Sequence, residues 1–353
     1  YQNYGGNISI EKFVDTNQRK ISWHRSLFQK ASKGIKTELN ENDFRIGLYR
    51  PFQKQLIYFN KHFASSPSQN PLIFPDSSYQ NKVIVVSGIG ADEFSCLSTD
   101  LIPNLHFLSS GQCFPLHYQE IINDEPSLSS VNLNLFSEKN NKLSGLDLNT
   151  KEKIKVQYEK YDISDKEIFY YVYAVLHSEE YRNKYKNNLS KELPRIPFVK
   201  SFSKFLELSN KGESLMDMHI NFENIEKYPI SFKEGHLELL PINNPIEFFR
   251  VEKMKFSNKN DKSEVFFNRN LTMVNIPVEA YQYKLNGKSA LELIMERQVV
   301  STDSKTGICN DANDSANEIM GNPRYPLELF QKIITLSLKT QEIIKDLPDL
   351  ELS

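Results

Sequence analysis

The stretch DKEIFYYVYAVLHSEEYRNKYKNNLSKELPRIP, Asp165 to Pro197, decides how the middle of this 353-residue chain folds. Ser164, just before it, and Glu167 have the spacing of a capping box, the pattern that opens many helices. The apolar residues that follow recur at the spacing of one helical face: Ile168, Val172, Val175 and Leu176. The first half of the stretch is therefore predicted to be a helix with one buried face.

The second half of the stretch is rich in positive charge. Between His177 and Lys204 the basic residues are Arg182, Lys184, Lys186, Lys191, Arg195, Lys200 and Lys204, against the acidic residues Glu179, Glu180 and Glu192. Basic side chains bind the phosphates of DNA, which supply much of the affinity of DNA-binding proteins. We expect phosphate contacts from five of them: Arg182, Lys184, Lys186, Arg195 and Lys200. Tyr181 and Tyr185, one turn apart, could lie against a sugar, although a solvated basic helix face would show the same pattern.

The composition narrows the class of protein. Hydrophobic residues make up 39% of the chain and aromatic residues 12%, enough to close a large core. No window of eighteen apolar residues occurs, so we expect no membrane contact. The cysteines are far apart, which favours neither a zinc site nor disulfides and fits the cytoplasm. The formal net charge is -2, so binding to nucleic acid would need a local basic patch. The chain begins at Tyr1 without a signal-peptide pattern, and we expect it to be a fragment of a longer polypeptide.

The remaining patterns predict an α+β fold with a mixed, strand-rich N-terminal part, a central pair of helices, further strands and C-terminal helices. We expect a strand-rich subdomain over residues 1–122, a polar surface excursion or joint over 123–160, and a helical frame with a strand insert over 161–353, together one domain. The expected strands are RIGLYRPF (45–52), QLIYFN (55–60), NKVIVVSG (81–88) and GQCFPLHYQ (111–119). The other expected helices are ISWHRSLFQKASKG (21–34), SFSKFLELSNKGESLMDMHI (201–220), SALELIMERQ (289–298) and PLELFQKIITLSLKTQEIIKDL (326–347).

Two short motifs are close to catalytic signatures, but both have a better structural explanation. VIVVSGIGAD, Val83 to Asp92, has the Gly-x-Gly of a nucleotide or S-adenosylmethionine loop, yet the third glycine is missing and no good helix follows. A tight turn between strands is favoured there. GNPRY, Gly321 to Tyr325, nearly spells the Asn-Pro-Pro-Tyr of adenine methyltransferases, but Pro326 favours a loop that leads into a helix. We find no pattern for nucleophilic catalysis, and we expect His177 to be a half-buried, hydrogen-bonded residue.

Three longer stretches resemble one protein family. They are YRPF (49–52), EIFYYVYAVLHSEEYRNKYKNNLSKELPRIP (167–197) and LNGKSALELIMERQVVSTDSKTGICNDAND (285–314), and we call them the landmarks. With the closing NPRYPLELFQKIITLSLKTQEIIKDLP (322–348), they resemble the C-terminal target-recognition domain of Type ISP restriction-modification enzymes, single polypeptides often described as predicted helicases. The family usually has an acid and then an arginine after YRPF, where this chain has Gln53, Lys54 and Gln55, and a tryptophan where it has Leu293.

The resemblance implies a specificity module for double-stranded DNA that acts together with upstream domains of the same polypeptide. Those domains would be a nuclease, a DNA translocase and an adenine N6-methyltransferase. It also implies no cofactor in this chain, and S-adenosylmethionine, ATP and Mg²⁺ in the parent enzyme. We therefore expect the chain itself to be non-catalytic. Two alternatives remain open: a methyltransferase-like enzyme with a degenerate cofactor loop at SGIGAD, and a scaffold that docks only to the other domains.

Members with the same landmarks read different DNA sequences, so the resemblance implies base reading in the segments that do not match: about 60–80, 119–157 and 253–270. In EKMKFSNKNDKSEVFFNRN (252–270), Val265 and Phe267 predict a strand with one buried face after a polar loop. Because Lys, Arg and Asn suit base edges, the candidates are Lys255, Asn258, Asn260, Lys262, Asn268 and Arg269. A hairpin tip enriched in Asn and Lys by genome composition is the simpler explanation for any single one of them.

Overall fold

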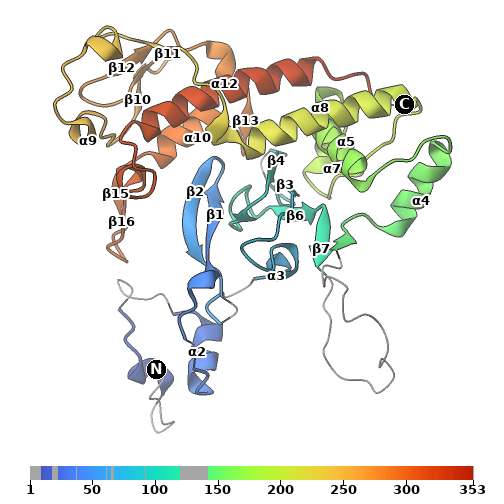
Figure 1. Ribbon diagram of the computed structural model, residues 1–353, viewed down its shortest axis with the longest axis horizontal. Coiled ribbons are helices and arrows are strands. Elements are labelled where there is room, and N and C mark those ends of the chain that lie inside the picture. Colours follow the sequence, from blue (N-terminus) through green and yellow to red (C-terminus); the bar gives the residue numbers. More distant parts are fainter. Residues whose placement is uncertain are drawn as a thin grey trace.

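Two long helices run side by side along the long axis of the molecule and support the other elements (Figure 1). They are α8 (Phe202–Ile220) and α12 (Tyr325–Lys345). In Figure 1 the strands of the N-terminal half lie below this pair, and the sheet that contains β10, β11 and β12 lies at one end of it. The computed structural model describes residues 9–17, 23–36, 38–60, 62–64, 67–91, 93–119 and 142–352.

The strands form several small sheets rather than one large one. One sheet has the order β2–β1–β5 and another β4–β3–β6, with strands β1 (Phe44–Arg50), β2 (Gln53–Tyr58), β3 (Val83–Val86), β4 (Cys96–Thr99), β5 (Ile102–Pro103) and β6 (Gln112–Pro115). A third sheet has the order β10–β11–β12–β9, with strands β9 (Ser231–Phe232), β10 (Lys255–Asn258), β11 (Asp261–Phe266) and β12 (Thr272–Val274). The two-stranded ribbons pair β7 (His117–Gln119) with β8 (Lys142–Ser144), β13 (Lys284–Leu285) with β14 (Lys288–Ser289), and β15 (Ser301–Thr302) with β16 (Cys309–Asn310).

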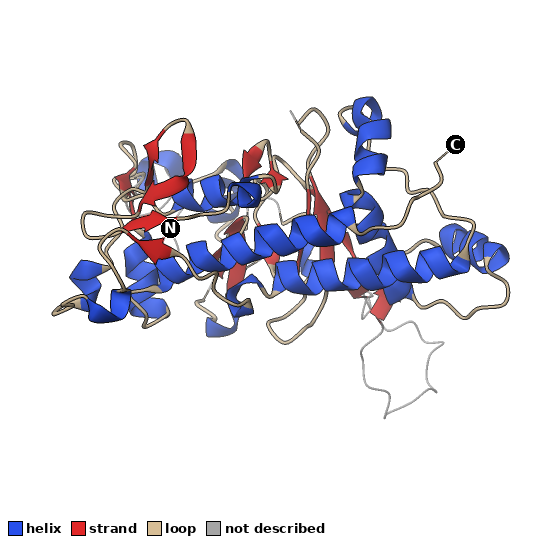
Figure 2. Ribbon diagram, turned by 90° about the horizontal axis from the view of Figure 1, so that it is seen from above, coloured by secondary structure: helices blue, strands red, loops and turns tan. Residues whose placement is uncertain are grey.

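The other α-helices are mostly short. They are α1 (Ile10–Phe13), α2 (Arg25–Ser32), α3 (Asn70–Ile73), α4 (Leu148–Gln157), α5 (Asp165–His177), α6 (Glu179–Lys184), α7 (Lys186–Leu189), α9 (Pro245–Phe248), α10 (Ala290–Arg297) and α11 (Ala312–Asp314). Helix α11 continues as a π-helical turn, Ser315–Ile319. Seen from above, the long helices run along the molecule and the strands lie in separate small groups, which is an α+β arrangement (Figure 2).

The structure confirms the α+β class and the expected elements. Each of the four expected strand segments contains a strand, and GQCFPLHYQ divides into β6 and β7. Helix α5 opens with the expected capping box, in which Ser164 and Glu167 bond each other's backbone. The helix expected over 21–34 begins at Arg25 and ends before Gly34, whose φ of 66° lies in the left-handed region that favours glycine.

The segment expected to be a polar excursion, residues 123–160, is described only in part. Residues 123–141 lie outside the described residues. The remainder contains regular structure, because β8 pairs with β7 and α4 begins with Asp147, whose side chain accepts a bond from the backbone N–H of Thr150 at 2.9 Å. The division into segments 1–122, 123–160 and 161–353 stays a prediction.

Strand β3 separates two hydrophobic cores. All four of its residues are buried, and because successive side chains of a strand point to opposite faces, it faces both cores. Val83 and Val85 belong to the core that the third sheet, α10 and the first half of α12 share, whereas Ile84 and Val86 belong to the core around α5 and α8. The described N-terminal strands and the later helices are therefore packed into common cores.

Helices α5 and α8 come into backbone contact at Gly212. A Cβ atom on this residue would collide with the backbone carbonyl of Tyr170 on α5, so only glycine fits. Around the contact, the aromatic rings of Tyr171 and Phe205 stack with centroids 4.8 Å apart. The close approach fixes α8 against α5, and through α8 it positions α12.

A buried chain of hydrogen bonds then joins three helices. The hydroxyl of Tyr173 on α5 lies 2.6 Å from Nδ1 of His219 on α8, and Nε2 of His219 lies 2.9 Å from the hydroxyl of Thr340 on α12. The Tyr173 hydroxyl also accepts the backbone N–H of Ser98 on β4 at 3.0 Å. Buried polar groups need such partners, so the chain sets the relative positions of these helices and the sheet.

We predict that Gly212→Ala lowers the free energy of unfolding by about 1–3 kcal/mol, because the added methyl group forces α8 away from α5. This loss should appear although alanine favours a helix by about 1 kcal/mol over glycine. Asn210→Ala, at an exposed position of the same helix, is the matched control and should change little. Urea denaturation of both variants measures the difference, and equal stability of the two would contradict the backbone contact.

Candidate nucleic-acid interface

The basic half of the opening stretch forms α6, α7 and the loop that follows them. Lys186 and Lys200 have exposed side chains, and the exposed Arg195 has Nη2 3.0 Å from a carboxylate oxygen of Glu192. Lys184 is also exposed, with its ammonium 5.9 Å from the centroid of the Tyr185 ring. Four of the five expected phosphate-binding cations thus lie on the surface, within one short region of chain.

Arg182 lies deeper than the other four. Its Nε donates to the backbone oxygen of Leu176 at 2.6 Å, and its guanidinium lies over the ring of Phe94 at 5.6 Å. These contacts hold the side chain half-buried against α5, so its charge contributes to the local potential more than to a direct contact. Phosphate binding by the five cations stays a prediction.

The two tyrosines of this region differ in exposure. Tyr181 is buried and donates its hydroxyl to the backbone oxygen of Arg195 at 3.0 Å, so the expectation that it lies against a sugar is wrong. Sequence spacing placed it on the rim of the helix, but the returning loop covers it. Tyr185 is half-buried and lines a cavity of about 370 Å³ together with Asn188 and Arg195. Of the four exposed cations, Arg195 lines this cavity.

The expected base-reading segment forms the β10–β11 hairpin and the turn after it. The buried Val265 and the exposed Phe266 confirm the strand with one buried face. Lys255, Asn258 and Asn260 are exposed on the hairpin. The candidates are thus displayed at the edge of a small sheet.

The last three candidates have partners within the protein. Lys262 is ion-paired with Glu292 at 2.9 Å, and the exposed Arg269 is ion-paired with Glu247 at 2.6 Å. Asn268 is buried, and its amide nitrogen donates to the backbone oxygens of Phe248 and Arg250 at 2.8 and 3.0 Å. Asn268 therefore holds the turn with its amide, and it does not belong to the residues that we propose to read bases.

The two predicted sets lie far from each other. Helix α7 lies toward the end of the long axis that carries the C-terminus, and β10 and β11 lie at the other end (Figures 1 and 2). The structure does not bring the predicted phosphate-binding and base-reading residues together into one site.

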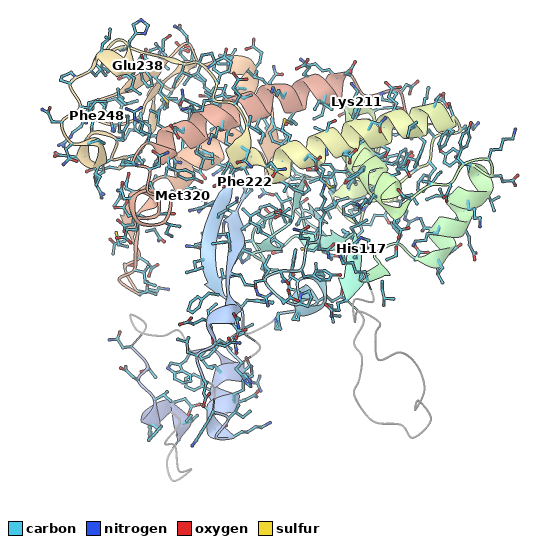
Figure 3. The ribbon with its side chains drawn as sticks, in the orientation of Figure 1. His117, Lys211, Phe222, Glu238, Phe248 and Met320 are labelled. Carbon is cyan, nitrogen blue, oxygen red and sulfur yellow. The ribbon has the colours of Figure 1, made fainter. Side chains whose placement is uncertain are left out.

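Between the two ends of the molecule, residues of the first and third landmarks and of the closing stretch come together. They line a cavity of about 620 Å³ together with residues of β2, α11 and the π-helical turn after it. Phe222 lies where the β1–β2 turn meets the long helices, and Met320, which lines the cavity, lies near the start of α12 (Figure 3). Three polar atoms of the lining are buried without a hydrogen-bond partner among the described residues: Oε1 of Gln53, Nε of Arg297 and Oε1 of Gln298. Arg297 was not among the residues predicted from the sequence, where its place in the third landmark was its signal.

The two motifs close to catalytic signatures are structural here. The SGIGAD loop leaves β3 and returns as β4, which pairs with β3 antiparallel, and among the described residues between these strands, which leave out Asp92, no helix presents its N-terminus to a nucleotide. This arrangement confirms the turn and weighs against a cofactor loop. GNPRY leads into α12, as expected, and the hydroxyl of Tyr325 donates to the carboxylate of Glu223 inside the fold.

The buried histidines have structural partners. His177 is fully buried rather than half-buried, and its Nδ1 lies 2.9 Å from the backbone oxygen of Tyr173. Burial lowers the pKa of His177 well below its usual value, and burial together with the charge of Arg182 lowers the pKa of His219 to about 3. Both imidazoles are therefore neutral and enclosed, which suits packing rather than proton transfer to a substrate.

Within the part of the chain that the structure describes, no three His, Cys, Asp or Glu side chains gather in a way that could hold a metal ion. A search of the same residues for a helix able to cross a membrane found none.

The sequence matches the family model of the Type ISP C-terminal specificity domain over residues 2–329. This chain is a Type ISP specificity domain. The resemblance of the landmarks is thereby confirmed. A comparison with curated proteins found no significant match.

Solved structures of Type ISP and related enzymes contain the same fold. A nuclease-deletion mutant of the Type ISP enzyme LlaGI, in complex with a DNA substrate mimic, matches 98% of the specificity domain with a TM-score of 0.77 and 30% identity. The ATP-dependent Type ISP enzyme LlaBIII bound to DNA matches 100% with a TM-score of 0.81 and 30% identity, and the cryo-electron microscopy structure of a DrdV–DNA complex matches 99% with a TM-score of 0.78 and 26% identity. The specificity domain spans 24%, 21% and 32% of those chains, respectively.

We predict that the specificity domain loses stability as the pH falls from 7 toward 4. His219 stays neutral in the folded state, with a pKa of about 3, whereas in the unfolded chain it takes up a proton near its usual pKa of about 6.5. Between these values the unfolded state binds more protons, so each unit of pH costs up to about 1.4 kcal/mol per buried histidine. Urea midpoints measured from pH 7 to pH 5 test this.

His219→Gln should be less stable at pH 7 but should show a shallower decline with falling pH. His236→Gln, at an exposed position, is the control and should keep the wild-type slope. An unchanged slope in His219→Gln would mean that other groups cause the acid sensitivity.

Proposed function

We propose that this chain recognises a specific sequence of double-stranded DNA as the specificity domain of a larger Type ISP polypeptide. In that role it presents the target to an adenine N6-methyltransferase and licenses a translocating nuclease. One observation carries the proposal: the fold of this chain matches, over its full length, part of a Type ISP enzyme bound to DNA, at 30% identity. A match of this extent supports a common way of holding the duplex.

The catalytic work of such an enzyme belongs to its other parts. LlaBIII is described as ATP-dependent, and we assign ATP, Mg²⁺ and S-adenosylmethionine to the nuclease–translocase and methyltransferase regions of the parent polypeptide. We propose that the present chain contributes DNA recognition without catalysis, and that it acts in the cytoplasm, where the DNA is. A cofactor loop at SGIGAD receives no support from the antiparallel return of β4.

We assign backbone binding to the exposed cations Lys184, Lys186, Arg195 and Lys200, with the half-buried Arg182 adding to the local positive potential. Ammonium and guanidinium groups on a short, exposed segment can each meet a phosphate without any further ordering of the fold. The cavity beside Tyr185 and Arg195 gives space for a sugar between two phosphates.

We assign base reading to the β10–β11 hairpin and the turn after it, through Lys255, Asn258, Asn260 and Arg269. The hairpin projects from a small sheet, its candidates are exposed, and the segment lies outside the landmarks. Lys262 is a weaker candidate, because contact with a base would require it to leave Glu292. Since α7 and the hairpin lie at opposite ends of the molecule, the duplex would follow the long axis (Figure 1).

We predict that the purified chain binds duplex DNA with an affinity that falls steeply with salt. Lys186→Ala and Lys200→Ala should each weaken binding to all duplexes alike and reduce the slope of log K against log salt by roughly one. Lys339→Ala, an exposed position on α12, is the control. Fluorescence anisotropy with one labelled duplex at several salt concentrations measures these quantities. A wild-type chain that binds no duplex even at low salt would refute the proposed function.

We predict that Asn258→Ala or Asn260→Ala reduces discrimination at one base pair of the target by roughly 1–3 kcal/mol, because a bidentate amide contact to adenine is lost. Binding to unrelated duplexes should stay the same. Asn210→Ala, an exposed asparagine on α8, should leave both affinities unchanged. Competition with duplexes that carry each single substitution measures the effect. Unaltered discrimination in both variants would place base reading in the segments 60–80 or 119–157.

A further inference from the structure

We propose that Arg50 and Arg297 together bind a phosphodiester group of the DNA backbone. The inference rests on the proposed function and assigns a contact to two landmark residues that are far apart in the sequence. Arg50 ends β1 in the first landmark, and Arg297 ends α10 in the third. The site lies beside the turn between β1 and β2.

Arg50 is held in place by neutral groups. Its guanidinium lies over the ring of Tyr49, 4.0 Å from the centroid, and Nη1 donates to the backbone oxygen of Tyr49 at 2.7 Å and to Oδ1 of Asn104 at 3.1 Å. None of the ion pairs among the described residues involves it. The stacked, hydrogen-bonded side chain is preorganised, yet its charge is not matched by a carboxylate.

Arg297 is equally without a counter-charge. Its Nε is buried without a hydrogen-bond partner, and no described carboxylate lies within ion-pair distance of it. Two of the acids that line the cavity already form ion pairs with other cations: Asp311 with Arg250 and Glu223 with Lys54, each at 2.6 Å. Asp314 and Glu318, which also line the cavity, form no ion pair with Arg297.

The fold places the two arginines close together. Arg50 is paired with Gln53 across the β1–β2 turn, and Gln53 and Arg297 line the same cavity. Burial lowers the pKa of Arg50, and the positive charge of Arg297 lowers it further. Two like charges, both partly removed from water and without a counter-charge, repel each other. An anion between them would remove this cost.

A phosphodiester group suits the two guanidinium groups as the missing anion. Guanidinium groups bind phosphate oxygens with two parallel hydrogen bonds, and a pair of them can hold one phosphate from two sides. Both arginines belong to landmarks, which are common to family members that read different sequences, so a contact that ignores base sequence suits them.

Two loops lie between Arg50 and the basic segment. Asn104, which binds Arg50, begins the loop whose Ser109 oxygen accepts the backbone N–H of Gly88 at 3.1 Å. Two residues further on, Gly90 donates to the oxygen of Ser190, just after α7, at 3.1 Å. The loop between β3 and β4 thus contacts both the loop that begins at Asn104 and the residue that follows α7.

A purely structural role for Arg297 is the competing explanation, because a cation in the last turn of a helix stabilises that helix. The two roles predict opposite effects on stability. If Arg297 serves α10, Arg297→Gln lowers the melting temperature. If it is half of an anion site, the neutral variant relieves repulsion in the DNA-free protein, and the melting temperature stays the same or rises.

The test compares Arg50→Gln, Arg297→Gln and the exposed control Arg25→Gln in duplex binding at several salt concentrations. We expect each of the first two variants to bind matched and unrelated duplexes roughly tenfold more weakly and to reduce the salt slope by about one. Arg50→Lys and Arg297→Lys should keep the slope but lose affinity, because they keep the charge and lose the planar fork. Arg25→Gln should behave as the wild type.

The outcomes separate the possible explanations. Wild-type slopes in both glutamine variants, or a lowered melting temperature with unchanged binding, would overturn the arginine site and leave the proposed function intact. A wild-type chain that binds no duplex would instead refute the proposed function. Inorganic phosphate at matched ionic strength should raise the melting temperature much less than the duplex does. If it raised the wild-type temperature as much as the duplex, and did not raise that of Arg297→Gln, the ligand would be free phosphate and the assignment to DNA would be wrong.

Discussion

The contact of α8 with α5 at Gly212 is the constraint on which the other parts depend. With the two backbones touching, His219 on α8 can reach both Tyr173 on α5 and Thr340 on α12, and the three helices form one unit. Tyr173 also holds β4, and Lys82, just before β3, forms an ion pair with Asp217 on α8 at 2.7 Å. The sheet of β3 and β4 is therefore fixed to the helices. A rigid frame of this kind lets exposed side chains keep their positions without packing of their own.

Local patterns predicted most of the frame. The capping box at Ser164 and the alternation around Val265 each depend on neighbours a few residues away, and both are confirmed. Helix α5 forms as expected, but the prediction of one buried face is wrong: Phe169, Tyr170 and Tyr173 are also buried, because α8 and the sheet of β3 and β4 enclose the helix, whereas Val172 is only half-buried. Positions whose burial depends on contacts with distant parts of the sequence were harder to predict. Tyr181 was expected near the surface, and the loop that covers it returns only fourteen residues later. A strand after the SGIGAD turn was expected, but its residues were not assigned, because CLST shows no alternation when both faces of the strand are buried. Asn268 gave a local signal that was overlooked: its side chain accepts the backbone N–H of Asn270, a short-range turn that removes it from the surface.

The frame also explains why phosphate contacts and base contacts are assigned to different parts of the chain. The landmarks supply α6, α7, α10, most of α5 and the turn between β1 and β2, so they build the cores and carry the cations assigned to phosphates, except Lys200. The β10–β11 hairpin projects from a sheet at one end and contributes one buried face to the core, so its exposed face can change without disturbing the fold. Backbone contacts give affinity and register, whereas base contacts give discrimination. A domain built in this way can change its target while its relatives keep the same architecture.

The central claim is that this chain alone contains the information for one DNA sequence. Selection of bound molecules from a random duplex library, carried out with the purified chain at moderate salt and followed by sequencing, tests it most directly. We predict enrichment of a single defined sequence, because discrimination by base contacts adds to a backbone affinity that is equal for every member of the library. Retention of duplexes without any enriched sequence would contradict the claim, and would assign target choice to other parts of a Type ISP enzyme.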